Sequence, residues 1–421
     1  MARFRSQLIL AVLIPVLLTH SAIAADLTAP TATIPNEYFG LHIHHLDRPT
    51  PTPWPSVPVP EWRLWDADVT WPDIEPIKGQ WQFGRLDRYL SLAQQHGTSV
   101  LLPLCGSPPW ASARPQVRSN YTPGFSAEPA NLDDWRTYVR TVASRYKGRI
   151  QAYEIWNEPN LREFWSGTTD QLVTLTKEAA QIIHSEDPNA IVVSPSVTAS
   201  YGIPWFAEFL KKGGGLYVDA IGYHFYVDPQ TLLPEDMLPV IQRVRQLMSD
   251  NGLGNKPLWN TETGWFPPAK LDSEELAAGF LARAFILSWA AGVQRFYWYA
   301  WDNGAAAIVT YKEAEHLITP AGHAYQVMQQ WLVGAQMVGC MQTLDNTWTC
   351  QLNRGEKQNW IVWNSKWGLK FEVPKLWQIT SITPLLHDRK SVDGSNIDIG
   401  PAPVLLEGSL RVDTNAAVNR K

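Results

Sequence analysis

Short apolar runs alternate with longer amphipathic runs from about residue 38 to residue 332. Such short runs predict buried parallel strands, and the apolar positions at helical spacing between them predict crossover helices. The predicted strands cover residues 39–44, 62–65, 99–104, 150–156, 191–194, 220–224, 257–261 and 294–298. Eight such units predict the α/β class and, within it, a (β/α)8 TIM barrel.

After Leu332 the pattern changes to short alternating runs separated by turns. These runs cover residues 347–352, 359–364, 369–373, 378–382 and 404–410. Alternation with period two predicts antiparallel strands, so we expect a β-sandwich domain over 333–421 behind a barrel over 36–332. The short segment 25–35 before the barrel is able to add a strand to this β module.

The first residues have the pattern of a secretory signal. Arg3 and Arg5 precede an apolar run from Leu8 to Leu18, and Ala22-Ile23-Ala24 follows as a small-residue cleavage pattern. We therefore predict a signal peptide over 1–24 and a periplasmic or secreted protein. A retained anchor is the weaker alternative, because the run is shorter than the ~20 residues that span a bilayer. We expect no stable membrane span once the signal is removed.

Two stretches interrupt the regular alternation, the proline-rich segment 49–60 and the segment 113–129. Both follow predicted strands, so in a barrel they are expected on the C-terminal face, where long loops build clefts. Trp54 and Trp110 lie in or near these stretches and suggest a cleft with several subsites. A passive surface insertion is the alternative.

Charge and composition narrow the choice of ligand. The formal net charge is −5 with no visible basic stripe, which argues against nucleic acid as a partner. The chain has 21 tryptophans, and aromatic faces pack against the apolar faces of sugar rings. We expect some of these tryptophans to line a cleft and the others to lie in the core.

The three cysteines are Cys105, Cys340 and Cys350. Cys340 and Cys350 flank a predicted turn at 344–347, so in an exported protein they are able to form a disulfide between adjacent strands. Suitable strand geometry decides whether they do. Cys105 is then a lone thiol, and no neighbouring residue in the sequence resembles an activating base for it.

Two strand-like segments each end at a glutamate. They are Tyr153-Glu154-Ile155-Trp156-Asn157-Glu158-Pro159-Asn160 and Leu258-Trp259-Asn260-Thr261-Glu262-Thr263-Gly264-Trp265. Barrel enzymes present functional groups at the C-terminal ends of their strands. Glycosidic bonds are cleaved by two carboxyl groups, one protonating the leaving oxygen and one attacking the sugar or activating water. Glu158 and Glu262 are therefore the candidate catalytic pair.

Several motifs together resemble the retaining glycoside hydrolases of clan A. The segments are Trp156-Asn157-Glu158-Pro159, Trp62-Arg63-Leu64-Trp65 and Ile221-Gly222-Tyr223-His224-Phe225-Tyr226, with the late Glu262. Within the clan the chain most resembles family 39, which holds β-xylosidases and endoglycosidases associated with bacterial exopolysaccharides. The resemblance covers the barrel and the β module, about 300 residues or more.

This resemblance implies a role for each matching residue. Glu158 corresponds to the acid/base and Glu262 to the nucleophile. Asn157 corresponds to the residue that binds the sugar 2-hydroxyl, and His224 and Tyr226 to sixth-strand residues, one of which hydrogen-bonds the nucleophile. Arg63 corresponds to an arginine beneath the nucleophile that favours its charged form.

Other acidic residues compete for these roles. Glu154 lies four residues before Glu158, or ~13 Å deeper on the same strand, so we expect it to be buried and paired with a cation. Glu75 is expected to be structural, and Asp66 to shape the floor of the site. Asp302 ends an aromatic segment in which Trp298 or Trp301 is the expected sugar platform.

His42, His44 and His45 suggest a metal site. His42 and His44 share one face of a strand while His45 faces the other way, which leaves at most two convergent ligands. We expect sugar-hydroxyl contacts from His42 or His44 instead. No metal and no organic cofactor is expected, because two carboxyl groups suffice for the reaction.

The leading hypothesis is an exported retaining glycosidase that attacks a polysaccharide or oligosaccharide within the chain, through a covalent glycosyl-enzyme. An exo-acting β-xylosidase-like enzyme, a transglycosylase and a non-catalytic carbohydrate-binding protein are the alternatives. Products from a set of polysaccharides distinguish them. The sequence leaves open which sugar is bound and whether the chain forms oligomers.

Overall fold

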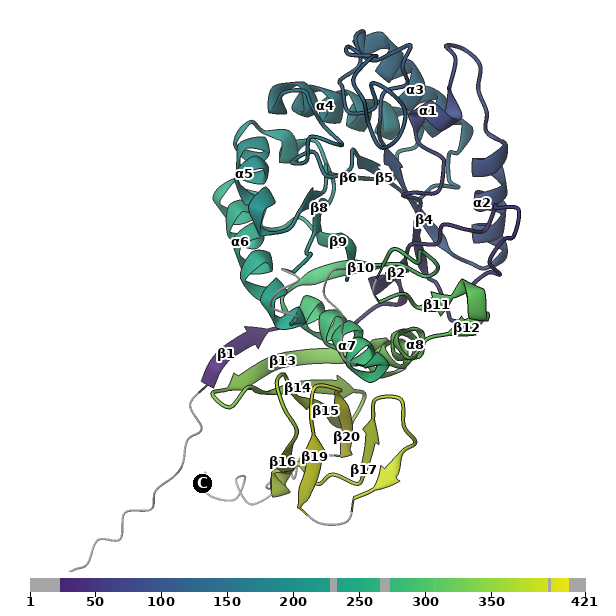
Figure 1. Ribbon diagram of the computed structural model, residues 1–421. Coiled ribbons are helices and arrows are strands. Elements are labelled where there is room, and N and C mark those ends of the chain that lie inside the picture. The colour runs from purple at the N-terminus through teal and green to yellow at the C-terminus, as the bar shows by residue number, and fades with distance from the viewer. Residues whose placement is uncertain (1–22, 228–232, 266–272, 307, 393–394, 409–421) are drawn as a thin grey trace, which may run out of the picture.

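The computed structural model describes residues 23–227, 233–265, 273–306, 308–392 and 395–408. Residues 1–22 of the predicted signal peptide lie outside this part. The described chain forms a ring of strands covered by helices and an antiparallel β module packed beside it (Figure 1). Among the described helices, none has the length and apolar character needed to cross a bilayer.

The ring is a curled, parallel, TIM-like sheet in the order β6-β5-β4-β3-β2-β10-β9-β8-β7. Its strands are β2 (Phe39–Leu41), β3 (Glu61–Arg63), β4 (Ser99–Leu104), β5 (Ala152–Ile155), β6 (Ile191–Val193), β7 (Val197–Thr198), β8 (Ile221–His224), β9 (Leu258–Gly264) and β10 (Val293–Tyr299). β6 and β7 are two parts of one extended segment, and single bridges from Val193 to Ala220 and from Asn157 to Ser196 join it to both neighbours. Each of the eight predicted strand segments is therefore present.

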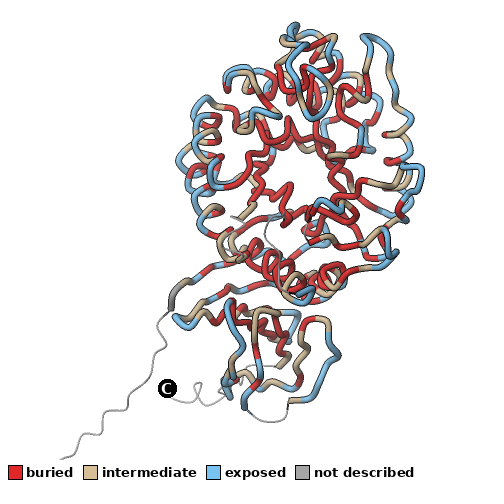
Figure 2. Tube along the Cα trace, viewed as in Figure 1, coloured by how far each residue is buried: buried red, intermediate tan, exposed pale blue. Residues whose placement is uncertain are grey.

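Helices cover the outside of this sheet, and its wall is continuously buried (Figure 2). They are α1 (Trp71–Ile74), α2 (Gly84–Gln95), α3 (Leu132–Arg145), α4 (Thr169–Glu186), α5 (Ile203–Lys211), α6 (Met237–Asp250), α7 (Glu274–Ala290) and α8 (Pro320–Leu332). A small two-stranded sheet of β11 (Tyr311–Lys312) and β12 (Leu317–Ile318) precedes α8.

The proline-rich segment 49–60 replaces the helix of the first crossover. Thr52 still lies near the rim, where its hydroxyl donates to Asp302 at 2.7 Å. Trp54 stacks on His96, just after the end of α2 and before β4, with ring centroids 4.3 Å apart. The segment therefore runs down the barrel wall, and the expectation that Trp54 builds a substrate cleft is wrong.

The β module contains a seven-stranded sheet in the order β1-β13-β14-β15-β20-β17-β18 and a separate pair, β16-β19. Its strands are β1 (Ile23–Thr28), β13 (Gln336–Thr343), β14 (Thr347–Arg354), β15 (Lys357–Asn364), β16 (Leu369–Glu372), β17 (Ser381–Pro384), β18 (Lys390–Ser391), β19 (Asn396–Ile399) and β20 (Val404–Gly408). β1, from the start of the described chain, pairs antiparallel with β13. Cys340 on β13 lies opposite Cys350 on β14, and the two form a disulfide.

Helix α7 joins the two parts. Every described residue from Ala278 to Ala290 is buried, as expected of a helix with packing partners on all sides. Arg283 lies on its module-facing side, donates to both carboxylate oxygens of Glu235 at 2.9 Å, and also donates to the Ser365 carbonyl. Trp363 of the module donates to the same glutamate at 2.9 Å. These shared bonds tie the β module to the barrel.

Candidate active site

Glu158 leaves the end of β5 on a distorted backbone. Trp156 has φ 74° and Glu158 has φ 41°, both in the left-handed region that costs a side-chain-bearing residue about 1–2 kcal/mol. The Trp156 ring packs outward against Trp165, at 4.8 Å between centroids, while the Glu158 amide donates to Ser196 at 2.8 Å. The turn thus directs Asn157 and Glu158 inward at the rim.

Glu262 reaches the same rim through a β-bulge. From Asn260 to Thr263 β9 advances three residues while its partner β10 advances two, from Phe296 to Trp298. The extra residue allows two consecutive side chains, Thr261 and Glu262, to face the interior, whereas a regular strand would turn one of them outward. Oxygens of Glu158 and Glu262 consequently lie within 4.8 Å of one another.

Arg63, on β3, connects the groups beneath the rim. Its guanidinium donates to Glu154 at 2.6 Å, to Glu262 at 2.8 Å and to the Asn157 side-chain oxygen at 2.7 Å. Arg63 and Glu154 are completely buried, as predicted for the deeper glutamate and its cation. Because Arg63 occupies the Asn157 oxygen, the Asn157 amide nitrogen is left as a donor, and it has no partner among the described residues.

Glu158 and Glu262 differ in their electrostatic surroundings. Burial raises the pKa of Glu158 to about 7. Burial also raises the pKa of Glu262, but Arg63 opposes this shift, and the Tyr226 hydroxyl donates to the same carboxylate at 2.9 Å. Glu158 therefore keeps a proton near neutral pH, while the direct bonds to Glu262 favour its charged form.

His224 links the two carboxyl groups. Its Nδ1 lies 2.9 Å from an oxygen of Glu158 and 4.0 Å from one of Glu262. Burial lowers the pKa of His224 to about 4, so the imidazole is neutral at neutral pH. A neutral ring shares one proton with Glu158 and adds no positive charge that would drive the proton off that carboxyl group.

A hollow of about 380 Å³ opens above the two glutamates, and we call it the glutamate hollow. It is lined by Trp65, Asp66, Tyr121, Glu158, Leu161, Phe164, Thr198, Tyr201, Tyr226, Glu262 and Tyr299. Apolar and aromatic walls with a few polar groups suit a sugar ring. The predicted long loop 113–129 contributes Tyr121.

The tryptophans expected to bind sugar lie elsewhere. Trp298 is fully buried and donates to the Ile308 carbonyl, and Trp301 is buried and stacks on Tyr311. Trp110 packs edge-on against Trp71 and donates to the Glu75 carbonyl. Alternation along β10 explains the error: Tyr297 and Tyr299 face the interior, so Trp298 between them faces the helices. Tyr299 and Trp65 provide aromatic walls instead.

The histidines that follow the first barrel strand, β2, differ in their surroundings. His42 is fully buried, contacts the Thr261 carbonyl at 3.1 Å and does not line the glutamate hollow, which argues against its expected sugar contact. Burial lowers its pKa well below the usual value. His44 lines a neighbouring hollow and lies 3.4 Å from Asp302.

Among the described residues, two groups have three possible metal-ligand atoms close together, Glu158-His224-Glu262 and His45-Asp302-Glu313. In both groups these side chains already bond to one another or to protein donors; for example, Asp302 accepts from the amides of His44 and His45. A cation would have to displace those bonds. The arrangement is thus explained by proton sharing and hydrogen bonding.

The other residues considered as catalytic candidates either stabilise the fold or order the wall of the glutamate hollow. Glu75 accepts from Trp71 at 2.9 Å and from the Gly79 amide at 2.8 Å. Asp66 accepts from Tyr121 at 2.7 Å and from Tyr299 at 2.9 Å, and so orders the wall of the glutamate hollow. Cys105 is a buried free thiol whose pKa is raised by burial.

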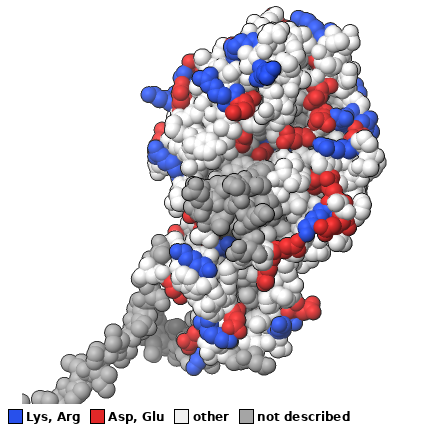
Figure 3. All heavy atoms as spheres, viewed as in Figure 1, with Lys and Arg blue, Asp and Glu red and all other residues white. Residues whose placement is uncertain are grey.

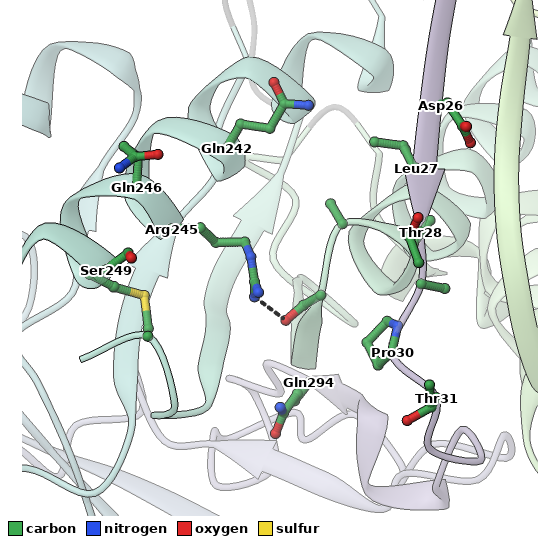
Figure 4. Close-up of a pocket in the computed structure, with 16 residues that line it drawn as sticks. Asp26, Leu27, Thr28, Pro30, Thr31, Gln242, Arg245, Gln246, Ser249 and Gln294 are labelled. Atoms are coloured by element: carbon green, nitrogen blue, oxygen red, sulfur yellow. Dashed lines mark hydrogen bonds between the residues drawn. The ribbon is translucent and has the colours of Figure 1, made fainter. Parts of the chain in front are cut away.

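A larger hollow, of about 820 Å³, lies between β1, α6 and the start of β10 (Figure 4). Its prominent cation, Arg245, bonds to the Gly292 carbonyl, and Asp26 is the one acid among its lining residues. It has no pair of carboxyl groups. On the surface shown in Figure 3, basic and acidic side chains are interspersed.

Comparison with known proteins gives the family of this chain. The family model "Glycosyl hydrolases family 39" matches residues 69–298, more than half of the sequence. A β-xylosidase of Geobacillus stearothermophilus is 26% identical over 189 residues, 39% of this chain and 37% of that protein. One from Caldicellulosiruptor saccharolyticus is 32% identical over 117 residues, 26% of this chain and 23% of that protein. The chain thus spans well under half the length of either relative.

Solved structures show the same fold at low identity. A family 39 β-xylosidase from Caulobacter crescentus superposes with a TM-score of 0.63 at 17% identity, over 92% of this chain and 98% of that one. A glucosidase from Croceicoccus marinus has a TM-score of 0.64 at 15% identity, with the same coverage. At these identities the likeness concerns the fold alone.

Proposed function

The chain belongs to glycosyl hydrolase family 39, and we propose that it is a retaining glycoside hydrolase acting on O-glycosidic bonds. The observation that carries this proposal is the close approach of Glu158 and Glu262, within 4.8 Å between oxygens, with Arg63 bonded to Glu262. Retaining enzymes hold their carboxyl groups about 5–5.5 Å apart, whereas inverting enzymes need a wider gap for water.

In the first step the Glu262 carboxylate attacks the anomeric carbon while Glu158 gives its proton to the departing oxygen. The old glycosidic bond breaks and a covalent glycosyl ester forms on Glu262. Esterification removes the negative charge of Glu262, so the pKa of Glu158 falls. The resulting Glu158 carboxylate takes a proton from water, which attacks the same carbon and releases the sugar with its original configuration.

Asn157 and Tyr226 assist the nucleophile in this scheme. The free amide donor of Asn157 is oriented by Arg63 and binds the sugar 2-hydroxyl, a contact that strengthens in the transition state. Tyr226 holds Glu262 through its hydroxyl. The same residues argue against a binding protein without turnover, which needs no such arrangement around a second carboxylate.

The finer fold assignment also belongs to this proposal. We infer that the curled sheet is the (β/α)8 barrel of this family, with segment 49–60 in place of one helix. The bridges at Val193 and Asn157 support closure. A sandwich in the β module is supported by the buried cluster that β16 and β19 share with β15 and β20.

We further propose an exported enzyme that cleaves within a bacterial exopolysaccharide. Its Cys340–Cys350 disulfide suits an oxidising compartment, and the hollow beside Asp66 offers room for more than one sugar. An exo-acting β-xylosidase is the second candidate, favoured by the names of the two sequence relatives. Product sizes from whole polysaccharides distinguish the two, and added sugar acceptors reveal transglycosylation.

The roles of the two glutamates are tested with aryl β-glycosides carrying a good leaving group. Glu158→Gln should release a burst of aryl alcohol and then turn over slowly, because the first step needs little acid help. Glu262→Gln should give no burst, while Glu163→Gln, at an exposed position, is the matched control and should behave as wild type. Added azide should restore the activity of Glu158→Ala, with a β-glycosyl azide as the product. It should restore the activity of Glu262→Gly with the α-glycosyl azide as the product. Full turnover by Glu262→Gln contradicts the scheme.

A further inference from the structure

A second hollow, of about 440 Å³, adjoins the glutamate hollow, and we call it the His44 hollow. It is lined by His44, His45, Arg48, Asp66, Asp68, Thr70, Pro72, Asp73, Asn120, Tyr121, Thr122, Phe125 and Asn303. Asp66 and Tyr121 line both hollows, so the two spaces meet at this pair. The Asp66 carboxylate is fixed there by bonds from Tyr121 and Tyr299.

Two side chains at the His44 hollow have polar atoms that lack a hydrogen-bond partner in the described part of the chain. His44 has a side chain only 1% exposed, and its Nε2 has no hydrogen bond. Its Nδ1 also makes no hydrogen bond, although it lies 3.4 Å from Asp302. The Thr122 hydroxyl is also shielded and unbonded. Buried polar groups without partners cost free energy, so two of them lining one hollow indicate groups that a ligand completes.

The charged groups around the hollow are largely occupied. Asp68 pairs with Arg85 at 3.0 Å, and Asp73 accepts from the amide of Thr70 at 2.9 Å. His45 pairs with Glu313, outside the lining. The side-chain groups of His44, Thr122 and the exposed Asn120 are left for a ligand, and mixed donors and acceptors of this kind match sugar hydroxyls.

The position of the His44 hollow relative to Glu158 decides which sugar of the substrate would bind in it. In the proposed function the departing sugar must lie beside the acid Glu158, where Leu161, Thr198 and Tyr201 form the wall of the glutamate hollow. The His44 hollow contains neither glutamate and joins the site at Asp66, on the other side. We propose that it is a subsite for the sugar preceding the one that is cleaved, on the non-reducing side of the scissile bond.

The acidic lining restricts the class of sugar. Asp68 is paired with Arg85, but Asp66 and Asp73 still outnumber Arg48 among the charged side chains of the lining, so a uronic acid there would face like charges. The subsite therefore suits a neutral or amino sugar. This inference rests on the proposed function, because it needs a cleaved bond to define the two sides.

The test compares aryl glycosides that differ by one sugar: xyloside with xylobioside, and glucoside with cellobioside, all β-linked. Wild type should cleave the two-sugar member of the accepted pair with kcat/KM at least about tenfold higher. Thr122→Val and Asn120→Ala should each lower kcat/KM about three- to tenfold on the two-sugar substrate and leave the one-sugar substrate unchanged. His44→Gln should act in the same direction.

Matched controls separate this effect from damage to the fold. Thr141→Val on the outer helix α3, and Asn255→Ala in the turn before β9, should change neither substrate. Equal losses on both substrates, or no loss on the longer one, overturn the subsite. If wild type cleaves the single-sugar glycoside equally well, the subsite fails but the proposed function stands. No release from any of the four glycosides, together with no products from any of the whole polysaccharides, contradicts the function and, with it, this inference.

Discussion

Replacing Glu158 with glutamine should stabilise the protein, and the gain should grow with pH. The side chain is buried, and burial raises its pKa from 4.5 to about 7. A shift of about 2.5 units corresponds to about 3 kcal/mol. Between these two pH values the folded chain keeps a proton that the unfolded chain has lost, so stability falls as pH rises and the loss is complete above about pH 7. Glutamine, which does not ionise, removes this loss.

Urea unfolding followed by tryptophan fluorescence measures the effect, from about pH 4.5 to about pH 8.5. The free energy of unfolding of Glu158→Gln minus that of wild type should increase by about 3 kcal/mol across this range and then level off. Glu163→Gln removes a nearby exposed carboxylate, and its difference from wild type should stay constant. A difference for Glu158→Gln that does not change with pH would show that Glu158 ionises normally, and would refute the reasoning.

Two other predictions concern catalysis and the β module. For a substrate with a poor leaving group, kcat/KM should fall as pH rises through about 7, because Glu158 loses the proton that it must donate. This fall should nearly vanish for a substrate with a strongly activated aryl leaving group. An equal fall for both substrates would contradict the assignment of Glu158 as the acid. Replacing Cys340 and Cys350 with serine should lower the free energy of unfolding by about 2–4 kcal/mol, measured by denaturation with and without reductant; wild type should respond to reductant and the double variant should not.

The order of elements could be predicted from the sequence because it depends on local periodicity. All eight predicted barrel strands occur, with ends that differ by a few residues. The sequence pattern does not predict β13, β18 and β19 of the β module: the polar and apolar positions of β13 are mixed, β18 has two residues, and β19 alternates over only four residues. The path of segment 49–60 was also missed: its prolines exclude a helix, but only the packing of Trp54 on His96 reveals that it descends along the barrel wall.

The site shows where regular alternation ceases to be informative. On β3 and β10 alternation holds. An inward Arg63 therefore predicts that Trp65 also faces inward, and an inward Tyr297 predicts the same for Tyr299. This pattern is present in the sequence and favours Tyr299 over Trp298 as the aromatic wall of the site. On β9 the bulge reverses the rule, because Thr261 already faces inward and a regular strand would send Glu262 into the helix layer. Only pairing with β10 supplies the extra residue. The proposed nucleophile therefore depends on a register shift between strands, which a pattern read along one strand does not contain.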